Sequence, residues 1–281
     1  MRQRPAWEAY ERLAADGEYG PLLNQAGELA LPADGEKEAA FFRATLGGRK
    51  RVLDVGCGPG FPSVALAEVA GGICGVDASG AMLASAQRNI AALGIGNIYL
   101  VRALGEALPF AESSFDGFAV CGTLGSLLNP QAVLSELCRV ATPGALAASI
   151  EWDFRSRVPE GGPRAEHWLR RGADWLELQV VRYMIQPYLI RTERYTLDPC
   201  SDLGRRLIVD LELAEGGRKR TELSPDEVPG EALLDACYEE EAQFDPETLR
   251  DAFVAAGFEV LEQRVAASYG VSHIFSVFRR G

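Results

Sequence analysis

A regular alternation of short apolar runs and helix-forming segments occupies residues 51–150. Five runs have the length and composition of buried strands, at 51–55, 72–76, 97–101, 115–120 and 145–150. Helical segments are expected between several of them, at 63–70, 81–93 and 131–140. Strands that are apolar along their whole length and are separated by helices are typical of a parallel sheet covered on both faces. The sequence therefore predicts an α/β domain over this stretch.

The alternation stops at residue 151 and resumes near residue 244. In between, the sequence predicts a long helix at 163–185, a hairpin strand at 207–213 that turns at 215–217, and a short acidic helix at 231–241. After the interruption, Asp245 and Pro246 indicate the start of a helix and Gly257 indicates its end. Two further strands are expected at 258–266 and 272–278.

These segments suggest three parts. Residues 1–48 form a helical N-terminal cap, and residues 49–151 and 244–281 together form the sheet domain. Residues 152–243 form an inserted α+β subdomain that serves as a lid, as a substrate-binding element or as a dimerisation surface. The hairpin at 207–213 offers an edge through which a homodimer could pair.

Charge and composition exclude several classes of partner. The 281 residues carry 28 Lys and Arg against 40 Asp and Glu, which gives a formal net charge of −12. This charge opposes binding to phosphate backbones and to anionic lipid, so neither nucleic acid nor a membrane is an expected partner. The chain has no apolar run of membrane-spanning length, and its first residues turn polar before a signal-peptide core develops. The six cysteines have no metal-ligand spacing, so we expect a cytoplasmic protein with reduced thiols and no metal site.

The strongest chemical signal is a glycine-rich turn between the first strand and the helix that follows it. Asp54 lies one residue before the end of the strand, and Gly56, Gly58 and Gly60 follow in alternation. Glycines in such a turn let the backbone approach a ligand closely, although a glycine turn alone also occurs in purely structural loops. Asp77 ends the next strand, nineteen residues after Gly58, where a carboxylate can accept hydrogen bonds from both hydroxyls of a ribose. The two signals together predict a ligand that contains adenosine.

Two classes of cofactor fit this arrangement. A dinucleotide fingerprint requires a third glycine at position 61, where this chain has Phe61, so a nicotinamide-dependent oxidoreductase is disfavoured. Instead, the chain resembles the class I S-adenosylmethionine-dependent methyltransferases. The resemblance is carried by LDVGCGPG (53–60), GVDASGAML (75–83), GEALPFAESSFD (105–116) and RVATPGALA (139–147), in the order and spacing of that family.

The resemblance implies a Rossmann-like, doubly wound sheet of seven strands that is mostly parallel, with the last strand antiparallel. It also implies S-adenosylmethionine as cofactor and S-adenosylhomocysteine as product. The residues expected at the methionine half of the cofactor are Asp54, Gly56, Cys57, Gly58, Gly60, Cys121 and Gly122. The residues expected at the adenosine half are Asp77 on the ribose and Ala78, Ser79, Met82, Leu104, Gly105 and Glu106 around the adenine. For Asp54, both a place near the cofactor's amino group and a role in holding the turn are open.

Two positions depart from patterns found among relatives. An aspartate that meets the adenine amino group in many of them is replaced by Leu104, so that contact would be weaker or supplied by Glu106. The segment 121–124 reads Cys-Gly-Thr-Leu and lacks the Asn/Asp-Pro-Pro-aromatic tetrad of enzymes that methylate planar amines. A small-molecule acceptor is therefore the first expectation.

Methyl transfer is an in-line displacement, so the protein mainly aligns the acceptor, and a general base is needed only if the nucleophile must lose a proton. The candidate bases are Asp153 and His167, with Glu151 close by in sequence. Each has a structural alternative: Asp153 could form a cap or pair with Arg155, and His167 could be a solvated helix residue. A catalytically silent module that binds the cofactor or a partner chain is the alternative function.

Overall fold

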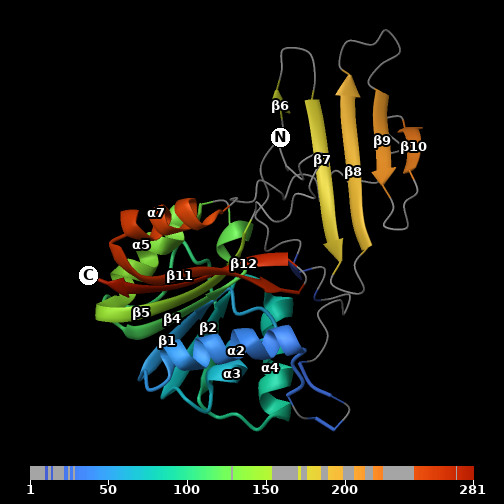
Figure 1. Ribbon diagram of the computed structural model, residues 1–281. Helices are drawn as coiled ribbons and strands as arrows, with labels where there is room; N and C mark the ends of the chain where they lie inside the picture. Colours follow the sequence, from blue (N-terminus) through green and yellow to red (C-terminus); the bar gives the residue numbers. More distant parts are fainter. Residues whose placement is uncertain are drawn as a thin grey trace. The chain divides into compact units, whose positions relative to one another are not determined.

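The computed structural model describes residues 22–24, 26–27, 29–127, 129–153, 244–269 and 271–281 (Figure 1). It also describes Tyr10, Glu11 and Ala14, and the backbone of five strands between residues 170 and 223. The chain divides into two compact units. One comprises Trp7–Ser156 and Ala242–Gly281, and the other comprises Met1–Ala6 and Arg157–Glu241.

The first unit is built on a seven-stranded sheet in the order β11-β12-β5-β4-β1-β2-β3. Its strands are β1 (Arg51–Val55), β2 (Gly72–Asp77), β3 (Ile98–Arg102), β4 (Phe115–Cys121), β5 (Ala141–Trp152), β11 (Phe258–Ser268) and β12 (Val271–Arg280). β1 pairs in parallel with both β2 and β4, and β4 pairs in parallel with β5. The last strand, β12, runs antiparallel to both of its neighbours. The predicted α/β sheet of seven strands with an antiparallel last strand is therefore confirmed.

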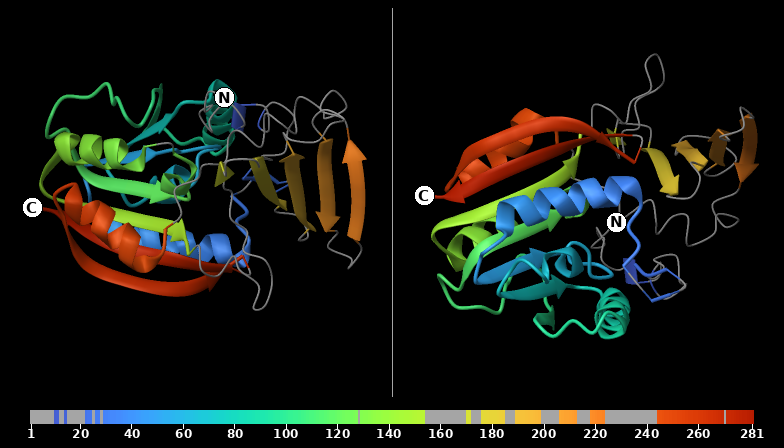
Figure 2. Two further views of the ribbon diagram at one scale, coloured as in Figure 1. Left: turned by 90° about the horizontal axis from the view of Figure 1, so that it is seen from above. Right: turned by 60° about the horizontal axis from the view of Figure 1, so that its bottom comes forward.

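Helices cover both faces of this sheet, with α5 and α7 on one face and α2 and α3 on the other (Figures 1 and 2). The helices are α2 (Ala33–Leu46), α3 (Ser63–Leu66), α4 (Gly80–Ala92), α5 (Pro130–Val140) and α7 (Pro246–Ala255), with a 3-10 turn η1 (Leu124–Ser126) after β4. α3 is shorter than predicted, because the chain continues as turns after Leu66 and reaches the Gly71-Gly72 pair that opens β2.

The core consists of two apolar clusters, one on each face of the sheet. Adjacent residues of β1 belong to different clusters: Val52 packs with Phe42 of α2, whereas Leu53 packs on the side of Phe253 and Phe278. This alternation is what a strand buried on both faces requires. The rings of Phe253 and Phe278 are stacked, with centroids 3.8 Å apart.

The predicted boundaries of the helix after the insertion are confirmed by its capping. Asp245 accepts hydrogen bonds from the backbone N–H groups of Glu247 and Thr248, and the Thr248 hydroxyl in turn accepts from the Asp245 N–H. Pro246 lies at the first helical position. Because Asp245 and Thr248 satisfy donors that a helix start leaves unpaired, α7 begins at a fixed residue.

The described part of the second unit is a five-stranded sheet in the order β10-β9-β8-β7-β6, with every pairing antiparallel. Its strands are β6 (Arg170–Arg171), β7 (Leu176–Met184), β8 (Leu189–Asp198), β9 (Arg206–Glu212) and β10 (Arg218–Leu223). The predicted hairpin is confirmed, since β9 pairs with β10 from Leu207 opposite Leu223 to Glu212 opposite Arg218.

The helix predicted at 163–185 is wrong, because β6 and β7 occupy part of this range. Apolar residues at 176, 178 and 180 alternate with polar residues at 177 and 179, which is the period of a strand. Valines at 180 and 181 and a tyrosine at 183 also favour a strand. The acidic helix predicted at 231–241 lies outside the described residues.

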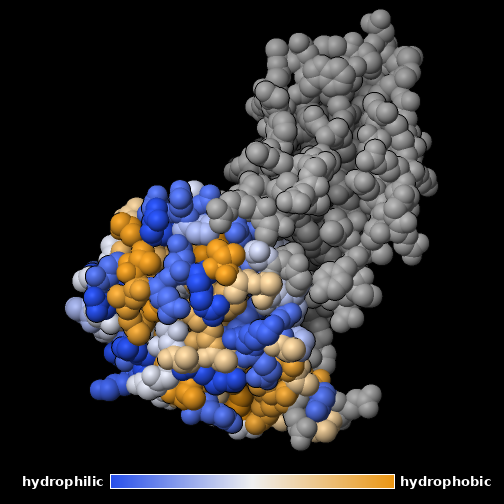
Figure 3. All heavy atoms as spheres, in the orientation of Figure 1, coloured by the Kyte–Doolittle hydropathy of each residue, from blue (hydrophilic) through white to orange (hydrophobic). Residues whose placement is uncertain are grey.

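The surface of the first unit mixes polar and apolar residues on the face seen in Figure 3. Among its described residues, the exposed large apolar side chains are Tyr99, Leu104, Val254, Leu261 and Val265. Among the described helices, none is both long enough and apolar enough to cross a bilayer. The described residues also contain no group of three His, Cys, Asp or Glu side chains placed to hold a metal ion.

Candidate functional site

The glycine-rich turn leaves β1 at the C-terminal edge of the parallel strands. Gly56, Gly58 and Gly60 have φ values of +69°, +50° and +110°, in the region that favours glycine. The N–H groups of Gly56 and Cys57 both donate to the carbonyl of Val76, at 2.8 and 3.0 Å. The turn is thereby tied to the end of β2, where the second predicted signal lies.

Gly56 and Gly58 differ in what surrounds them. A Cβ atom at Gly56 would lie 2.4 Å from the side chain of Thr123, so the turn packs directly against the loop that follows β4. A Cβ atom at Gly58 would meet no atom within 4 Å. The backbone at Gly58 therefore borders open space, as a ligand-binding turn requires.

Asp54 is buried beneath the turn and only half of its carboxylate is engaged. Its Oδ2 atom accepts hydrogen bonds from the N–H and the hydroxyl of Ser63, at 3.1 and 2.6 Å. Its buried Oδ1 atom has no hydrogen-bond partner among the described residues. Burial raises the pKa of Asp54 to about 7. Asp54 thus holds the turn to the start of α3 and keeps one acceptor available.

Asp77 connects the glycine turn to the start of α4. Its Oδ2 atom accepts from the Gly58 N–H at 2.9 Å, and its Oδ1 atom accepts from the Ser79 N–H at 2.8 Å. Burial raises the pKa of Asp77, and the charge of Glu11 adds to this effect. Ser79 caps α4 by accepting from the Met82 N–H at 3.1 Å. The residues predicted at the ribose and on one side of the adenine are therefore brought together.

Glu11 also reaches this edge, which the sequence did not indicate. Its carboxylate accepts from the Ser79 hydroxyl at 2.6 Å and from the Ala81 N–H at 3.1 Å. These hydrogen bonds lower the pKa of Glu11, and the charge of Arg102 contributes. Arg102 in turn donates to the carbonyl of Ala78 at 2.9 Å. Glu11 is thereby anchored beside the residues expected to hold the adenosine.

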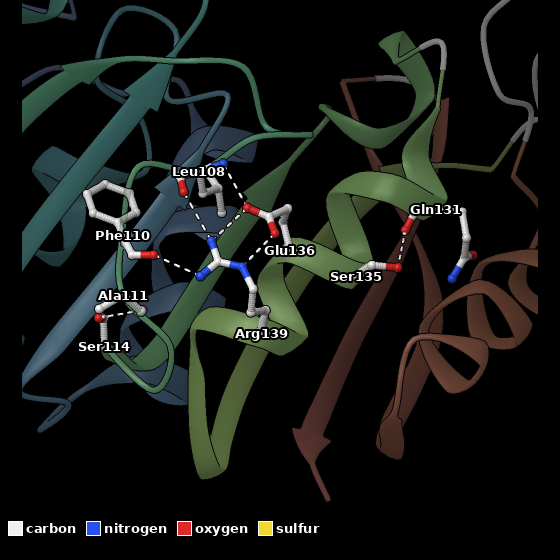
Figure 4. Close-up of polar contacts among 8 residues, drawn as sticks. All are labelled: Leu108, Phe110, Ala111, Ser114, Gln131, Ser135, Glu136 and Arg139. Carbon is white, nitrogen blue, oxygen red and sulfur yellow. Dashed lines mark hydrogen bonds and ion pairs between the residues drawn. The ribbon is translucent and has the colours of Figure 1, made fainter.

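The loop after β3, which carries Leu104, Gly105 and Glu106, is held by a clamp on α5 (Figure 4). Arg139 donates to the carbonyls of Leu108 and Phe110, at 3.1 and 2.8 Å. Glu136 accepts from the Leu108 N–H at 2.8 Å and forms an ion pair with Arg139 at 2.6 Å. The conformation of the loop is therefore fixed from α5.

The loop after β4 is held by Glu151, which the sequence analysis considered as a base. One carboxylate oxygen of Glu151 accepts from the N–H groups of Thr123 and Leu124, at 3.1 and 3.0 Å. The other accepts from Gly125 N–H at 3.4 Å. The Thr123 hydroxyl donates to the Val55 carbonyl at 3.1 Å and so joins this loop to β1. The geometry gives Glu151 a structural role, and places Cys121 and Gly122 next to the glycine turn.

Of the two candidate bases, Asp153 lies among the described residues and His167 does not. Asp153 is buried directly after β5, at the same edge of the sheet, and its N–H donates to the carbonyl of Ser272 at 2.9 Å. His167 lies outside the described residues, and so does Arg155, the alternative partner of Asp153. Burial raises the pKa of the Cys57 and Cys121 thiols, so neither is a thiolate nucleophile at neutral pH.

Leu104 and Glu106 provide a test of which residue would contact the adenine of the expected cofactor. Leu104 is 47% exposed, whereas Glu106 is partly buried. We expect Glu106→Ala to weaken S-adenosylhomocysteine binding about tenfold, as loss of one hydrogen bond to a charged group would. Leu104→Ala should change the affinity less than about twofold, because an exposed side chain loses little burial. Calorimetry of both variants measures the difference, and equal effects would contradict the assignment to Glu106.

Comparison with known proteins agrees with this geometry. Residues 52–144 match the family described as "Methyltransferase domain". The demethylmenaquinone methyltransferase of Geobacillus kaustophilus is 35% identical over 105 residues, which are 36% of this chain and 45% of that protein. That of Shouchella clausii is 37% identical over 102 residues, or 35% and 43% of the two chains. The chain thus matches less than half the length of these curated relatives.

Solved structures match over nearly the whole chain but at low identity. The CcbJ methyltransferase from Streptomyces caelestis has a TM-score of 0.56, 18% identity and full coverage of both chains. The [4+2]-cyclase SpnF has a TM-score of 0.61 and 14% identity, and covers 100% of this chain and 98% of its own. These similarities bear on the fold. The family match and the four ordered motifs show that residues 52–144 are similar to a methyltransferase domain, and the solved structures show that the fold is one found among methyltransferases.

Proposed function

We propose that this chain binds S-adenosylmethionine and transfers its methyl group to a small-molecule acceptor, releasing S-adenosylhomocysteine. The observation that carries the proposal is Asp77, whose carboxylate lies at the end of β2 between the Gly58 and Ser79 N–H groups. A carboxylate at this place in an open α/β sheet is suited to accept hydrogen bonds from ribose hydroxyls.

The residues at the site fit the two ends of this cofactor. The free Oδ1 atom of Asp54 is an acceptor beneath the turn, and a cationic amino group would satisfy it. The open space beside Gly58 leaves room for a ligand against the backbone. Ala78, Ser79 and Met82 would border the adenine from α4, and the loop clamped by Arg139 would border its other edge.

The cofactor would supply an activated methyl group on a sulfonium, whose carbon–sulfur bond breaks as the acceptor forms its bond to carbon and a neutral thioether leaves. The chain's own contribution is alignment of the acceptor and exclusion of water. Among the described residues, Asp153 is the candidate for taking a proton from the acceptor, because it lies at the same edge of the sheet as the glycine turn. His167 stays a second candidate from the sequence alone.

Relatives support a small molecule as the acceptor. Two matched proteins are named as demethylmenaquinone methyltransferases, and a Burkholderia thailandensis structure with a TM-score of 0.53 and 14% identity is named as a 1,6-didemethyltoxoflavin-N1-methyltransferase. The net charge of −12 also disfavours nucleic acid as the acceptor. A homodimer through the β9–β10 hairpin stays a prediction, which light scattering at several concentrations tests.

A thermal-shift comparison tests the proposed function. The full chain is heated alone and with S-adenosylmethionine, S-adenosylhomocysteine, NAD or NADP. A ligand at 100 times its dissociation constant adds about 2.7 kcal/mol to the free energy of unfolding, so a raised midpoint is expected with the two adenosyl sulfur compounds only. Stabilisation by a dinucleotide instead, or by none of the four ligands, contradicts the proposal. Binding without methylation of any acceptor would favour the silent module.

A further inference from the structure

A group of side chains lies where β5 ends and β12 begins, and it has no role in the cofactor site described above. We call it the aromatic edge, and it consists of Trp152 at the end of β5, Tyr269 in the β11–β12 turn and His273 in β12. Trp152 and His273 are direct partners in the antiparallel pairing, and their rings meet edge to face with centroids 5.7 Å apart. The Trp152 Nε1 atom lies 3.7 Å from where a Cβ at Gly122 would be. The aromatic edge therefore borders the residue expected near the sulfonium.

The aromatic edge faces α2. Ile150 lies two residues before Trp152 in β5, and Phe275 lies two residues after His273 in β12. Both pack with Phe42 of α2 in one core cluster. Residues two apart in a strand share a face of the sheet. Trp152 and Tyr269 keep part of their surface accessible, whereas His273 is buried. A ligand at this edge would therefore meet Trp152 and Tyr269.

Tyr269 is held in place by two carboxylates of α2. Asp34 accepts from the Tyr269 N–H at 2.9 Å, and Glu38 accepts from the neighbouring Ser268 hydroxyl at 2.6 Å. Tyr269 has a φ of +50°, which is uncommon for a tyrosine and persists only where the surroundings enforce it. Its hydroxyl lies 2.8 Å from where a Cβ at Gly35 would be, so the absence of a side chain at Gly35 leaves room for the phenol.

The electrostatic surroundings define what the phenol can bind. Burial raises the pKa of Tyr269, and the charges of Glu38 and Asp34 act in the same direction. The phenol therefore stays protonated and can donate a hydrogen bond. Asp34 is paired with Lys37 at 2.7 Å, so the buried carboxylate of Glu38 is the charge that disfavours an anionic ligand at this edge.

We propose that Trp152 and Tyr269 bind the methyl acceptor, and that this acceptor is a neutral planar aromatic ring carrying an oxygen substituent. The indole of Trp152 supplies an apolar face for the ring, and the Tyr269 hydroxyl donates to the oxygen. Asp34, Gly35 and Glu38 act as positioning residues, because they determine where the phenol lies. This inference rests on the proposed function, since the aromatic edge is an acceptor site only if Gly122 borders the cofactor.

The test uses the full chain loaded with S-adenosylhomocysteine and two probes, 1-naphthol and its anionic analogue 1-hydroxy-2-naphthoate. Ligand-observed NMR titration is expected to show that the neutral probe binds about tenfold more tightly than the anion. Tyr269→Phe should weaken 1-naphthol binding about fivefold, as loss of one neutral hydrogen bond would. Gly35→Ala should have the same effect by displacing the hydroxyl, and Trp152→Leu should weaken both probes.

Tyr99→Phe is the matched control, because Tyr99 is an exposed tyrosine on β3, at the opposite edge of the sheet. It should leave 1-naphthol binding unchanged, and Tyr269→Phe, Gly35→Ala and Tyr99→Phe should keep wild-type affinity for S-adenosylhomocysteine. If Tyr269→Phe and Gly35→Ala bind 1-naphthol like the wild type, or if neither probe binds, the assignment of the acceptor site is overturned. If the wild-type chain does not bind S-adenosylhomocysteine, that result contradicts the proposed function instead.

Discussion

Asp77→Asn is expected to weaken the binding of S-adenosylhomocysteine about 100-fold and to leave the chain folded. The carboxylate orders both sides of the site, since it accepts from Gly58 N–H at 2.9 Å and from Ser79 N–H at 2.8 Å. An amide offers one neutral acceptor oxygen in place of two charged ones, and a hydrogen bond to a charged group contributes about 1.5–3 kcal/mol. A loss of about 2.7 kcal/mol corresponds to the expected 100-fold change, which isothermal calorimetry measures directly.

Asp116→Asn provides the matched control for this experiment. Asp116 also accepts from two backbone N–H groups, those of Lys50 and Arg51 at 3.0 and 2.8 Å, but it does so at the N-terminal end of β1. The two variants thus lose comparable hydrogen bonds at opposite edges of the parallel sheet. Asp116→Asn should bind S-adenosylhomocysteine within about twofold of the wild type. Equal affinities of the two variants would show that the ribose is not held by Asp77.

Much of the fold could be predicted because its signals are local in the sequence. The five parallel strands are apolar runs of the right length, and α7 is bounded by Asp245 and Pro246 at its start. The inserted segment gave conflicting signals. Apolar residues at 169, 176, 180 and 184 fit the spacing of a helix, while those at 176, 178 and 180 fit a strand. Pairing of β7 with β8 decides between them, and that pairing is not visible in either segment alone.

In the candidate site too, some features follow from local sequence and others depend on contacts between distant residues. Asp54, Asp77 and the glycines lie within two short motifs, so their proximity follows from a strand, a turn and the next strand. The contact of Glu11 with Ser79 joins residues 68 apart, and that of Ser268 with Glu38 joins residues 230 apart. No local pattern indicates such pairs, because they form only when the helices pack on the sheet. The role of Glu151 was missed for a related reason, since its partners are backbone N–H groups rather than recognisable side chains.

Gly56→Ala is expected to lower the free energy of unfolding by about 3 kcal/mol and to abolish cofactor binding. A φ of +69° costs a residue with a side chain about 1–2 kcal/mol. The added methyl would also lie 2.4 Å from Thr123, and relieving such an overlap costs about 1–3 kcal/mol. Because Thr123 is bonded to Val55 and Glu151, the displacement would spread to both loops of the site. Thermal unfolding should show a midpoint lower by roughly 6–12 °C.

Gly58→Ala and Gly94→Ala separate the cost to folding from the cost to binding. Gly58 and Gly94 have φ values of +50° and +65°, and a Cβ at either position meets no atom within 4 Å. Both variants should therefore lose about 1 kcal/mol of stability from backbone strain alone. Gly94 follows α4, away from the glycine turn, so Gly94→Ala should bind S-adenosylhomocysteine like the wild type. Gly58→Ala should bind at least about tenfold more weakly, because its methyl fills the space left for the ligand. Equal affinities would mean that the open side of Gly58 faces solvent rather than the cofactor.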